Sequence, residues 1–406
     1  MGKPKIRFKG YTTDWEQRKL GDNIVEYTEK TTENNQYPVL TSSRKGIFFQ
    51  TDYYDGNQIA SADNTGYNIV PYGYFTYRHM SDDEIFHFNI NDIAENGIVS
   101  TLYPVFTTDE NLDSRYLQYQ LNYGREFAKY AILQKQGGSR TYMYLNKLRN
   151  LYITVPTTIE EQKKISECFT NLDHLITLHQ RKYEEMKTLK RYMLQKMFPQ
   201  SEQKVPEIRF AGFTEDWEQR KLSDIYDSIG NAFVGTATPY YAEQGYFYLE
   251  SNNVKDGQIN HNSEVFINDE FYEKQKDKWL HTGDMVMVQS GHVGHAAVIP
   301  EELDNTAAHA LIMFRNPKEE IEPYFLNYEY QTDKAKKKIE NITTGNTIKH
   351  ILASDMQEFV VDVPKYEEQK VIAGYFRNID HLITLHQQKC EELKNIKKFM
   401  LQNMFV

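Results

Sequence analysis

The sequence predicts an α+β protein in which two tandem α+β domains are separated by two long helices. These helices are expected to form an antiparallel coiled-coil stalk with pseudo-twofold symmetry. Three observations predict this arrangement: certain segments occur twice in nearly the same form, the segments enclosed by them differ, and one repeated segment has the pattern of a long uninterrupted helix.

The repeats are long and closely similar. Residues 6–22 (IRFKGYTTDWEQRKLGD) recur as residues 208–224 (IRFAGFTEDWEQRKLSD), a shift of 202. Residues 171–198 recur as residues 378–405 at a shift of 207, with 19 of 28 positions identical. Because the intervening sequences show no comparable identity, the chain is a duplication of one frame around two different contents.

The second repeated segment predicts a helix on each occurrence. Residues 160–198 contain no Gly or Pro, and their apolar positions step by three and four. A capping box at Thr157 with Glu160, or at Thr158 with Glu161, marks the start. Such a helix would extend ~58 Å at ~1.5 Å per residue, too long to hide its apolar stripe in a small domain. Residues 367–405 show the same pattern, so the two helices are expected to pack together; two separate helices, each on its own domain, are the alternative.

The boundaries follow from this pattern. Residues 1–155 form the first domain (module A), 156–200 the first helical region, 201–363 the second domain (module B) and 364–406 the second helical region. Each module begins with short aromatic and polar runs separated by turn residues, which predict strands and loops. A helix is expected at 114–133 in module A and at 323–339 in module B.

Polar loops near the end of each module are candidates for ligand contact. Residues 134–141 and 341–349 combine glycines, which let a backbone approach a ligand, with side chains that pair with base edges and phosphates. A solvated surface turn is the alternative, but the feature recurs in both modules. The candidate DNA-binding residues in these and similar loops are Ser43, Arg44, Arg78, Gln136, Arg140, Asn252, Gln289, Ser290, His292, Asn346 and Lys349.

No catalytic chemistry is expected within the chain. It lacks a Walker loop, a Gly-x-Gly-x-x-Gly and a Gly-x-Ser-x-Gly. Glu161 and Lys163 match half of a metal-nuclease motif but fall in the first helical turn, where a carboxylate is favoured anyway. The two cysteines, Cys168 and Cys390, can form neither a disulfide framework nor a four-cysteine zinc site. We therefore expect no catalytic residue and no bound metal. No apolar run is long enough to span a membrane, so a cytoplasmic protein is expected.

The sequence resembles the specificity subunits of type I restriction-modification enzymes. The resemblance covers the whole chain. It is carried by the DWEQRKL segments at Trp15 and Trp217, by the Glu-Glu-Gln triplets after each Val-Pro, and by the LDHLITLHQ and IDHLITLHQ helices. In module B, Gly283-Asp284, Ser290-Gly291 and Gly294 are similar to the family's GD…SG…G segment. Module A has only a distant analogue of it at residues 71–78.

The resemblance implies a non-catalytic DNA-recognition subunit. Each module, as a target-recognition domain, would bind one half of a bipartite, asymmetric double-stranded sequence, and the helices would fix the spacer. The helices would also carry two modification subunits, which methylate adenine with S-adenosylmethionine, and through them restriction subunits that use ATP and Mg. No cofactor is implied in this subunit. A duplicated adaptor for carbohydrate or peptide, or an acidic DNA-mimic anti-restriction protein, remains the alternative from the residues alone.

The net charge of −10 is unevenly spread along the chain. Module A carries 17 basic and 18 acidic residues, each helical region has two excess basic residues, and module B carries 15 basic and 28 acidic residues. Module A and the helices can therefore approach DNA without an overall electrostatic penalty. We expect the carboxylates of module B to lie away from the duplex, and the chain alone to bind DNA weakly without its modification subunits.

Overall fold

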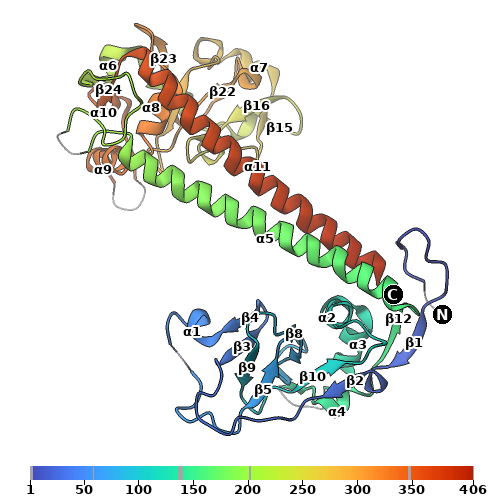
Figure 1. Cartoon of the computed structure of the whole chain (residues 1–406). Helices are drawn as coiled ribbons and strands as arrows, with labels where there is room; N and C mark the ends of the chain where they lie inside the picture. Colours follow the sequence, from blue (N-terminus) through green and yellow to red (C-terminus); the bar gives the residue numbers. More distant parts are fainter. Residues whose placement is uncertain (1–2, 58, 136–139, 201–202, 346–348, 406) are drawn as a thin grey trace. The chain divides into compact units, whose positions relative to one another are not determined.

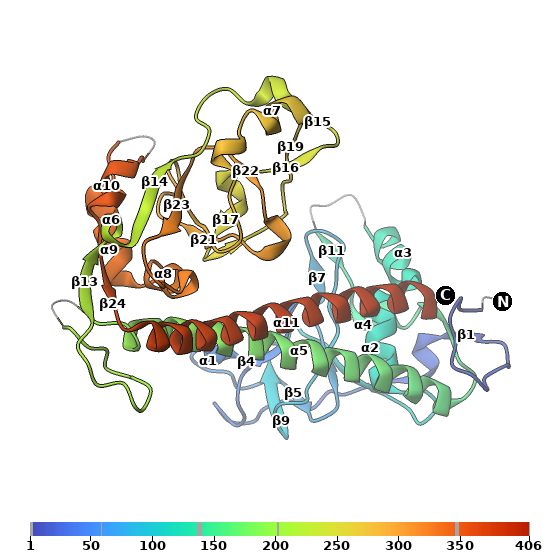
Figure 2. The same ribbon diagram turned by 90° about the horizontal axis from the view of Figure 1, so that it is seen from above.

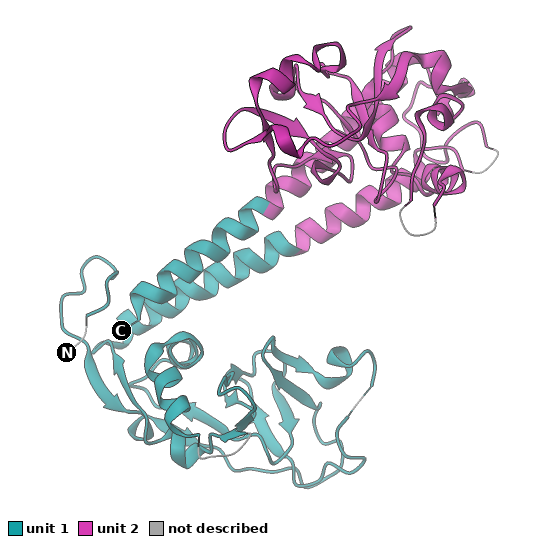
Figure 3. Cartoon of the chain, turned by 180° about the vertical axis from the view of Figure 1, so that it is seen from behind, with its two compact units in different colours: residues 1–180, 388–406 teal, residues 181–387 magenta. Residues whose placement is uncertain are grey.

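The computed structural model (Figure 1) describes residues 3–57, 59–135, 140–200, 203–345 and 349–405. The chain divides into two compact units, Met1–Gln180 with Gln388–Val406 and Arg181–Gln387 (Figure 3). Each unit holds one α+β module together with part of each long helix. The predicted α+β fold class is confirmed.

The two long helices are present at the expected places. Helix α5 spans Ile159–Lys196 and helix α11 spans Tyr366–Met404, within two residues of the predicted limits. At the start of α5, the Thr158 hydroxyl accepts a hydrogen bond from the Glu161 amide at 3.4 Å. The expected capping box is nevertheless only half formed, because the Glu161 carboxylate binds Arg7 instead of returning to the helix end.

The helices run antiparallel within each unit, as predicted (Figures 1 and 2). In the first unit, the α11 residue Lys397 pairs with Asp173 of α5 at 2.5 Å, and Cys390 lies 3.9 Å from the Ile176 carbonyl. In the second unit, Lys190 of α5 pairs with Asp380 of α11 at 2.7 Å. Along the contact, residue numbers increase in α5 while they decrease in α11, so the two helices run in opposite directions.

A repeated Ile-Arg-Phe segment ties the ends of the two helices together in each unit. In the first unit, the Ile6 amide donates to the Asn403 carbonyl at the end of α11 at 3.0 Å. The adjacent Arg7 forms a bidentate ion pair with Glu161 in the first turn of α5, at 2.6 and 2.7 Å. One short segment thus satisfies a free carbonyl of one helix and the buried carboxylate of the other.

The second unit repeats this clamp with the equivalent residues. Ile208 donates to the Lys196 carbonyl at the end of α5 at 2.8 Å. Arg209 binds Glu368 in the first turn of α11 through two bonds of 2.7 Å. Glu161 and Glu368 therefore have structural roles, which explains the half-match to a nuclease motif.

Short strands form the module of the first unit. A four-stranded sheet has the order β2-β10-β6-β8, and β1 pairs antiparallel with β12, so that the two ends of the module lie side by side. The strands are β1 (Glu16–Lys19), β2 (Ile24–Glu26), β3 (Leu40–Ser43), β4 (Gly46–Phe49), β5 (Asn68–Pro71), β6 (Phe75–Thr76), β7 (Met80–Ser81), β8 (Asn89–Ile90), β9 (Asn96–Val99), β10 (Val105–Thr108), β11 (Thr141–Tyr142) and β12 (Tyr152–Val155). The helices are α1 (Gln50–Tyr53), α2 (Ser114–Tyr123), α3 (Arg125–Leu133) and α4 (Leu145–Leu148).

The module of the second unit is built in the same way around a different core. Its sheets have the orders β14-β23-β20-β21 and β15-β19-β16-β22, and β13 pairs with β24 as β1 does with β12. The strands are β13 (Glu218–Lys221), β14 (Tyr226–Asn231), β15 (Tyr241–Ala242), β16 (Tyr246–Leu249), β17 (Val254–Lys255), β18 (Gln258–Ile259), β19 (Phe266–Ile267), β20 (Met285–Val288), β21 (Ala296–Val298), β22 (Ala307–Ala308), β23 (Leu311–Pro317) and β24 (Val360–Val363). The helices are α6 (Leu222–Ile225), α7 (Asp269–Glu273), α8 (Pro323–Glu329), α9 (Asp333–Ile342) and α10 (Ala353–Gln357).

Each single helix predicted within a module is in fact two helices. In module A the break falls at Gly124, whose extended backbone ends α2 and begins α3. In module B it falls before Thr332, whose hydroxyl caps α9 by accepting from the Ala335 amide at 3.2 Å. Both breaks use a residue that favours helix termini over helix interiors.

A glutamate in each module, partly buried in module A and buried in module B, braces its helix against the last strand. Glu126 accepts hydrogen bonds from the Thr154 amide, the Thr154 hydroxyl and Gln120 at 2.6–2.9 Å. Its counterpart Glu329 accepts only from the Asp362 amide, at 2.9 Å, and its second oxygen has no partner in the described part of the chain. Burial raises the pKa of Glu329 to about 8.

The first prediction concerns the clamp. Replacing Arg7 by alanine leaves Glu161, whose side chain is 1% exposed, as a buried carboxylate without its cation. The free energy of unfolding should fall by about 3 kcal/mol, and Arg209→Ala should have a similar effect. Urea denaturation of the full chain measures both. Lys3→Ala is the control, because its ion pair with Asp14 is exposed on both sides and should leave stability unchanged. Equal effects of Arg7→Ala and Lys3→Ala would contradict this role of the clamp.

The second prediction concerns pH. A glutamate with a pKa of about 8 in the folded chain and its ordinary 4.5 in the unfolded chain holds a proton that the unfolded chain loses. Stability should therefore fall as pH rises from 4.5 to about 8 and level off above it. Glu329→Gln keeps the acceptor oxygen and cannot ionise, so its melting temperature should exceed that of the wild type increasingly toward pH 8. A difference that does not change with pH would contradict the raised pKa.

Candidate nucleic-acid interface

Three cations from two predicted loops of module A converge on one acidic turn, residues 82–84. Arg140 pairs with Asp82 at 2.8 Å, Arg44 pairs with Asp83, and Lys135 pairs with Glu84. The hairpin of β3 and β4 presents Arg44, and the segment leading into β11 presents Arg140. The structure thus brings together cations that are far apart in the sequence.

These cations are held by carboxylates on the surface. The Arg44 guanidinium, with the Ser81 hydroxyl, keeps the pKa of Asp83 well below its ordinary value. Asp83 is therefore charged at neutral pH, and it neutralises Arg44 in the free chain. Because both side chains are about half exposed, this pair is weak and an acceptor group of a ligand could replace the carboxylate.

Arg78 lies beside an aromatic group that the sequence did not reveal. Arg78 is exposed and makes no hydrogen bond or ion pair with the described residues. The next residue, His79, is buried and stacks on Tyr144 with ring centroids 4.9 Å apart, and Tyr144 in turn stacks on Tyr142 at 5.9 Å. Tyr142 and Tyr144 are 36% and 48% exposed, so their rings offer a surface on which bases could stack. In the sequence, Tyr142 and Tyr144 alternate with Met143 directly after the predicted loop, and this alternation is the signal that could indicate the stacking surface.

Ser43 and Gln136 are the two remaining candidate residues of module A. The Ser43 hydroxyl is used inside its own hairpin, where it accepts from the Lys45 amide and donates to the Gly46 carbonyl, both at 3.1 Å. Arg44 is therefore better placed than Ser43 to contact a ligand from that turn. Gln136 lies outside the described residues.

The predicted loops of module B also meet. The Ile351 amide donates to the Gln289 carbonyl, and the Gly291 amide donates to the Lys349 carbonyl, both at 3.0 Å. Between them, Ser290 and His350 form an isolated antiparallel β-bridge. These backbone bonds place the two segments side by side. Lys349 is paired with Glu340 at 3.4 Å, and Asn346 lies outside the described residues.

A third loop joins this group through a histidine. His292 donates from Nε2 to the Ser251 carbonyl at 3.0 Å, next to the exposed Asn252. Gly294 holds a positive φ of 88°, and a Cβ there would come within 2.9 Å of the Ile339 side chain. The repeated glycines of this segment thus allow its loop to pack closely on α9.

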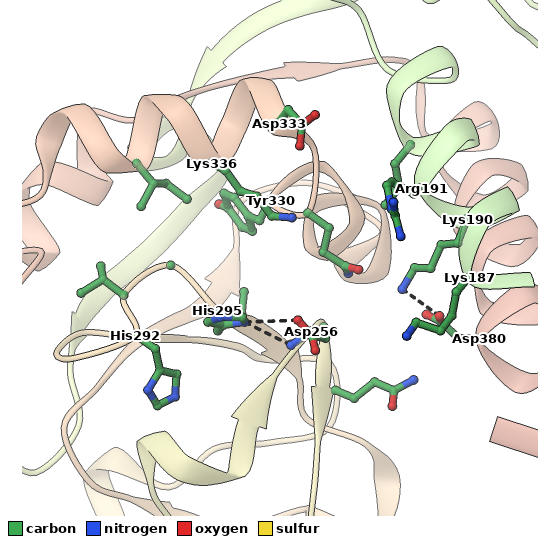
Figure 4. A pocket seen from close by; sticks show the side chains of 18 of the residues that line it. Lys187, Lys190, Arg191, Asp256, His292, His295, Tyr330, Asp333, Lys336 and Asp380 are labelled. Carbon is green, nitrogen blue, oxygen red and sulfur yellow. Dashed lines mark hydrogen bonds and ion pairs between the residues drawn. The ribbon is translucent and has the colours of Figure 1, made fainter. Parts of the chain in front are cut away.

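The module B loop borders a cavity of about 820 Å³. Figure 4 shows three groups of lining side chains. His292 and His295 come from the loop. Lys336 lies on α9 and Tyr330 in the turn before it. The third group, on α5, is Lys187, Lys190 and Arg191. Asp256 donates its amide to Nδ1 of His295 at 3.1 Å. Burial lowers the pKa of His295, so its ring is neutral at pH 7.

Sites of two other kinds are absent from the described residues. They contain no group of three or more His, Cys, Asp or Glu side chains placed to hold a metal ion. None of their helices is both long and apolar enough to cross a membrane.

Fold and site together define a protein that presents two different polar, partly cationic loop groups on one duplicated helical frame. The family model of the type I restriction modification DNA specificity domain matches residues 12–188 and again residues 214–395. The chain therefore belongs to this family and carries its domain twice. It is a specificity subunit of the type I class, which recognises DNA and is not itself catalytic; this decides against the adaptor and DNA-mimic alternatives.

Individual relatives agree with this assignment. The chain is 24% identical over 315 residues to the type I restriction enzyme MjaVIII specificity subunit of Methanocaldococcus jannaschii, an alignment that covers 75% of this chain and 73% of the relative. The crystal structure of a type I restriction-modification system S subunit from M. genitalium has a TM-score of 0.61 and 12% identity, and the match covers 100% and 99% of the two chains. The latter likeness confirms the fold.

Proposed function

We propose that this chain recognises a bipartite, asymmetric duplex, with residues 1–155 and 201–363 as the two target-recognition domains. The observation that supports this most directly is the difference between the two loop groups on equivalent frames. Module A offers arginines and exposed tyrosines around the turn at residues 82–84, whereas module B offers Gln289, His292 and Lys349. Different donors and acceptors select different base edges, so two half-sites of different sequence follow.

The proposed division of labour within each loop group follows from side-chain chemistry. Arginine can bind guanine through two parallel hydrogen bonds, and glutamine can bind adenine in the same way. The lysines are better suited to phosphates, because an ammonium group acts as a point charge. We assign base contacts to Arg44, Arg78, Arg140, Gln289 and His292, and phosphate contacts to Lys349.

The helical regions, residues 156–200 and 364–406, are proposed as the scaffold for two copies of one modification subunit. Exposed apolar side chains occur at equivalent positions in both units. Ile396 and Phe399 are 38% and 57% exposed in the first unit, and Leu189 and Tyr192 are 36% and 53% exposed in the second. Leu189 and Tyr192 also line a hollow of about 580 Å³. Two equivalent apolar surfaces on one chain can bind two copies of the same subunit.

The rest of the complex follows from this assignment. The modification subunits would supply adenine methylation with S-adenosylmethionine, and the restriction subunits bound through them would use ATP and Mg. The chain itself would hold no cofactor and would act inside the cell, where its DNA target is.

The third prediction separates the two modules. Arg140→Ala should relax the methylated half-site read by module A, and Gln289→Ala should relax the other, each by ~1–3 kcal/mol of discrimination. Methylome sequencing of a strain that carries the complete system measures both. Lys182→Ala is a matched control, because Lys182 pairs with Glu185 along the helix and lies in neither loop group. If both variants altered the same half-site, the division between the modules would be wrong.

The fourth prediction concerns the partners. Tyr192→Lys and Phe399→Lys each place a charge on one of the two equivalent apolar surfaces without filling buried space. Native mass spectrometry of the chain co-expressed with its modification subunit should show two copies on the wild type, one on each single variant and none on the double variant. Two copies retained on the double variant would exclude these surfaces.

A further inference from the structure

The acidic module B faces a set of cations that comes from the helical frame. Lys187, Lys190 and Arg191 of α5 line the cavity of about 820 Å³ that His292 and Lys349 also line. Figure 4 shows the three helix side chains on one wall and the loop with His292 opposite. The helix thus supplies positive charge at the place where the module presents its DNA-binding loops.

Within this set, one cation is engaged and two are available. Lys190 is 12% exposed, pairs with Asp380 at 2.7 Å and lies 5.2 Å from the Tyr328 ring centre. Lys187 and Arg191 are exposed and form no ion pair with the described residues, although Lys187 lies over the Tyr183 ring. The carboxylates in the cavity have other neighbours: Asp380 binds Lys190, Glu340 binds Lys349 and Asp256 lies beside His295, while Asp333 opens the first turn of α9.

The first unit contains equivalent cations on α11, beside a cavity that Tyr123 and Arg125 of its module line instead of the predicted recognition loops. A cavity of about 510 Å³ is lined by Lys394, Lys397 and Lys398, which correspond to Lys187, Lys190 and Arg191 at the shift of 207. Lys397 pairs with Asp173 and lies 5.5 Å from the Tyr119 ring centre, as Lys190 does with Asp380 and Tyr328. Lys394 and Lys398 are exposed and form no ion pair within the described chain. Arg125 of α3 lines the same cavity.

We propose that Lys187 with Arg191, and Lys394 with Lys398, bind backbone phosphates of the DNA independently of its sequence. The same cations stand beside two modules that differ in their recognition loops, so they suit the part of a duplex that is the same at both half-sites, which is the phosphate backbone. The inference depends on the proposed function of the chain.

These phosphate contacts would also account for DNA binding by a domain with 28 acidic and 15 basic residues. A phosphate that enters the cavity of the second unit meets Lys187, Arg191 and Lys336 near the loops of module B, and no described carboxylate pairs with these three. The lining of this cavity holds five lysines or arginines and four carboxylates, so it lacks the large acidic excess of the module as a whole.

The test uses the full chain in complex with its modification subunits and a fluorescent duplex of arbitrary sequence, because the chain alone is expected to bind DNA weakly. Two double variants are compared, Lys187→Ala with Arg191→Ala and Lys394→Ala with Lys398→Ala. Alanine keeps the helix, and melting temperatures verify folding. Each variant should bind more weakly, and the slope of log affinity against log salt should fall by about 0.9 for each phosphate that the protein no longer neutralises. The ratio of specific to arbitrary-sequence affinity should not change, because every base-reading side chain is kept.

The control removes two positive charges from equivalent helix positions outside both cavities. Lys182→Ala with Lys389→Ala breaks the ion pairs with Glu185 and Glu392 and should leave the slope unchanged. A steep wild-type slope that is unchanged in both test variants overturns this inference alone. So does an equal decrease in the control. Native mass spectrometry that shows fewer bound modification subunits on the test variants, with an unchanged slope, also overturns it and indicates a protein partner. A wild-type complex whose binding to DNA is insensitive to salt would instead overturn the proposed function.

Discussion

The structure depends on the ion pair between an arginine near the start of each repeat and a glutamate in the first turn of a long helix. The pairs of Arg7 with Glu161 and of Arg209 with Glu368 are bidentate, and the carboxylate of each pair is buried. The amide preceding each arginine binds the last carbonyls of the other helix. Because one segment holds both helices, the frame fixes their pairing within a unit whatever the module contains. The sequence between the repeats is then free to differ.

That freedom is visible in the two loop groups. Module A gathers its cations around three consecutive carboxylates, whereas module B joins its loops by backbone hydrogen bonds between residues 289–291 and 349–351. The two solutions share no residue pattern, although both lie on strands and loops fixed to the same frame. The paired carboxylates in module A also orient Arg44 and Arg140 while no nucleic acid is bound.

The duplication made the large features predictable from sequence. Repeat shifts of 202 and 207 residues indicate the frame, and the apolar stripe of residues 160–198 indicates a helix that needs a partner. The finer features depend on contacts across long sequence separations. Nothing local to Glu161 points to Arg7, and nothing in residues 82–84 identifies Arg44 or Arg140 as partners. The break at Gly124 was missed because the apolar spacing continues across it. The excess basic charge of the helical regions is visible in the sequence, but the sequence does not indicate which helix cations line the cavities, because charged positions on a long helix usually face solvent.

The braces Glu126 and Glu329 occupy equivalent positions in the two modules but differ in their hydrogen bonds. Glu126 receives three hydrogen bonds, while Glu329 receives one and stands next to a second carboxylate, Asp362, that is itself held by Lys334. The two units therefore need not unfold as one cooperative block. At alkaline pH, where Glu329 loses its proton, amide exchange near β24 should report local opening before the corresponding strand β12 does. The duplicated frame thus carries two modules that are expected to differ in their local opening at alkaline pH.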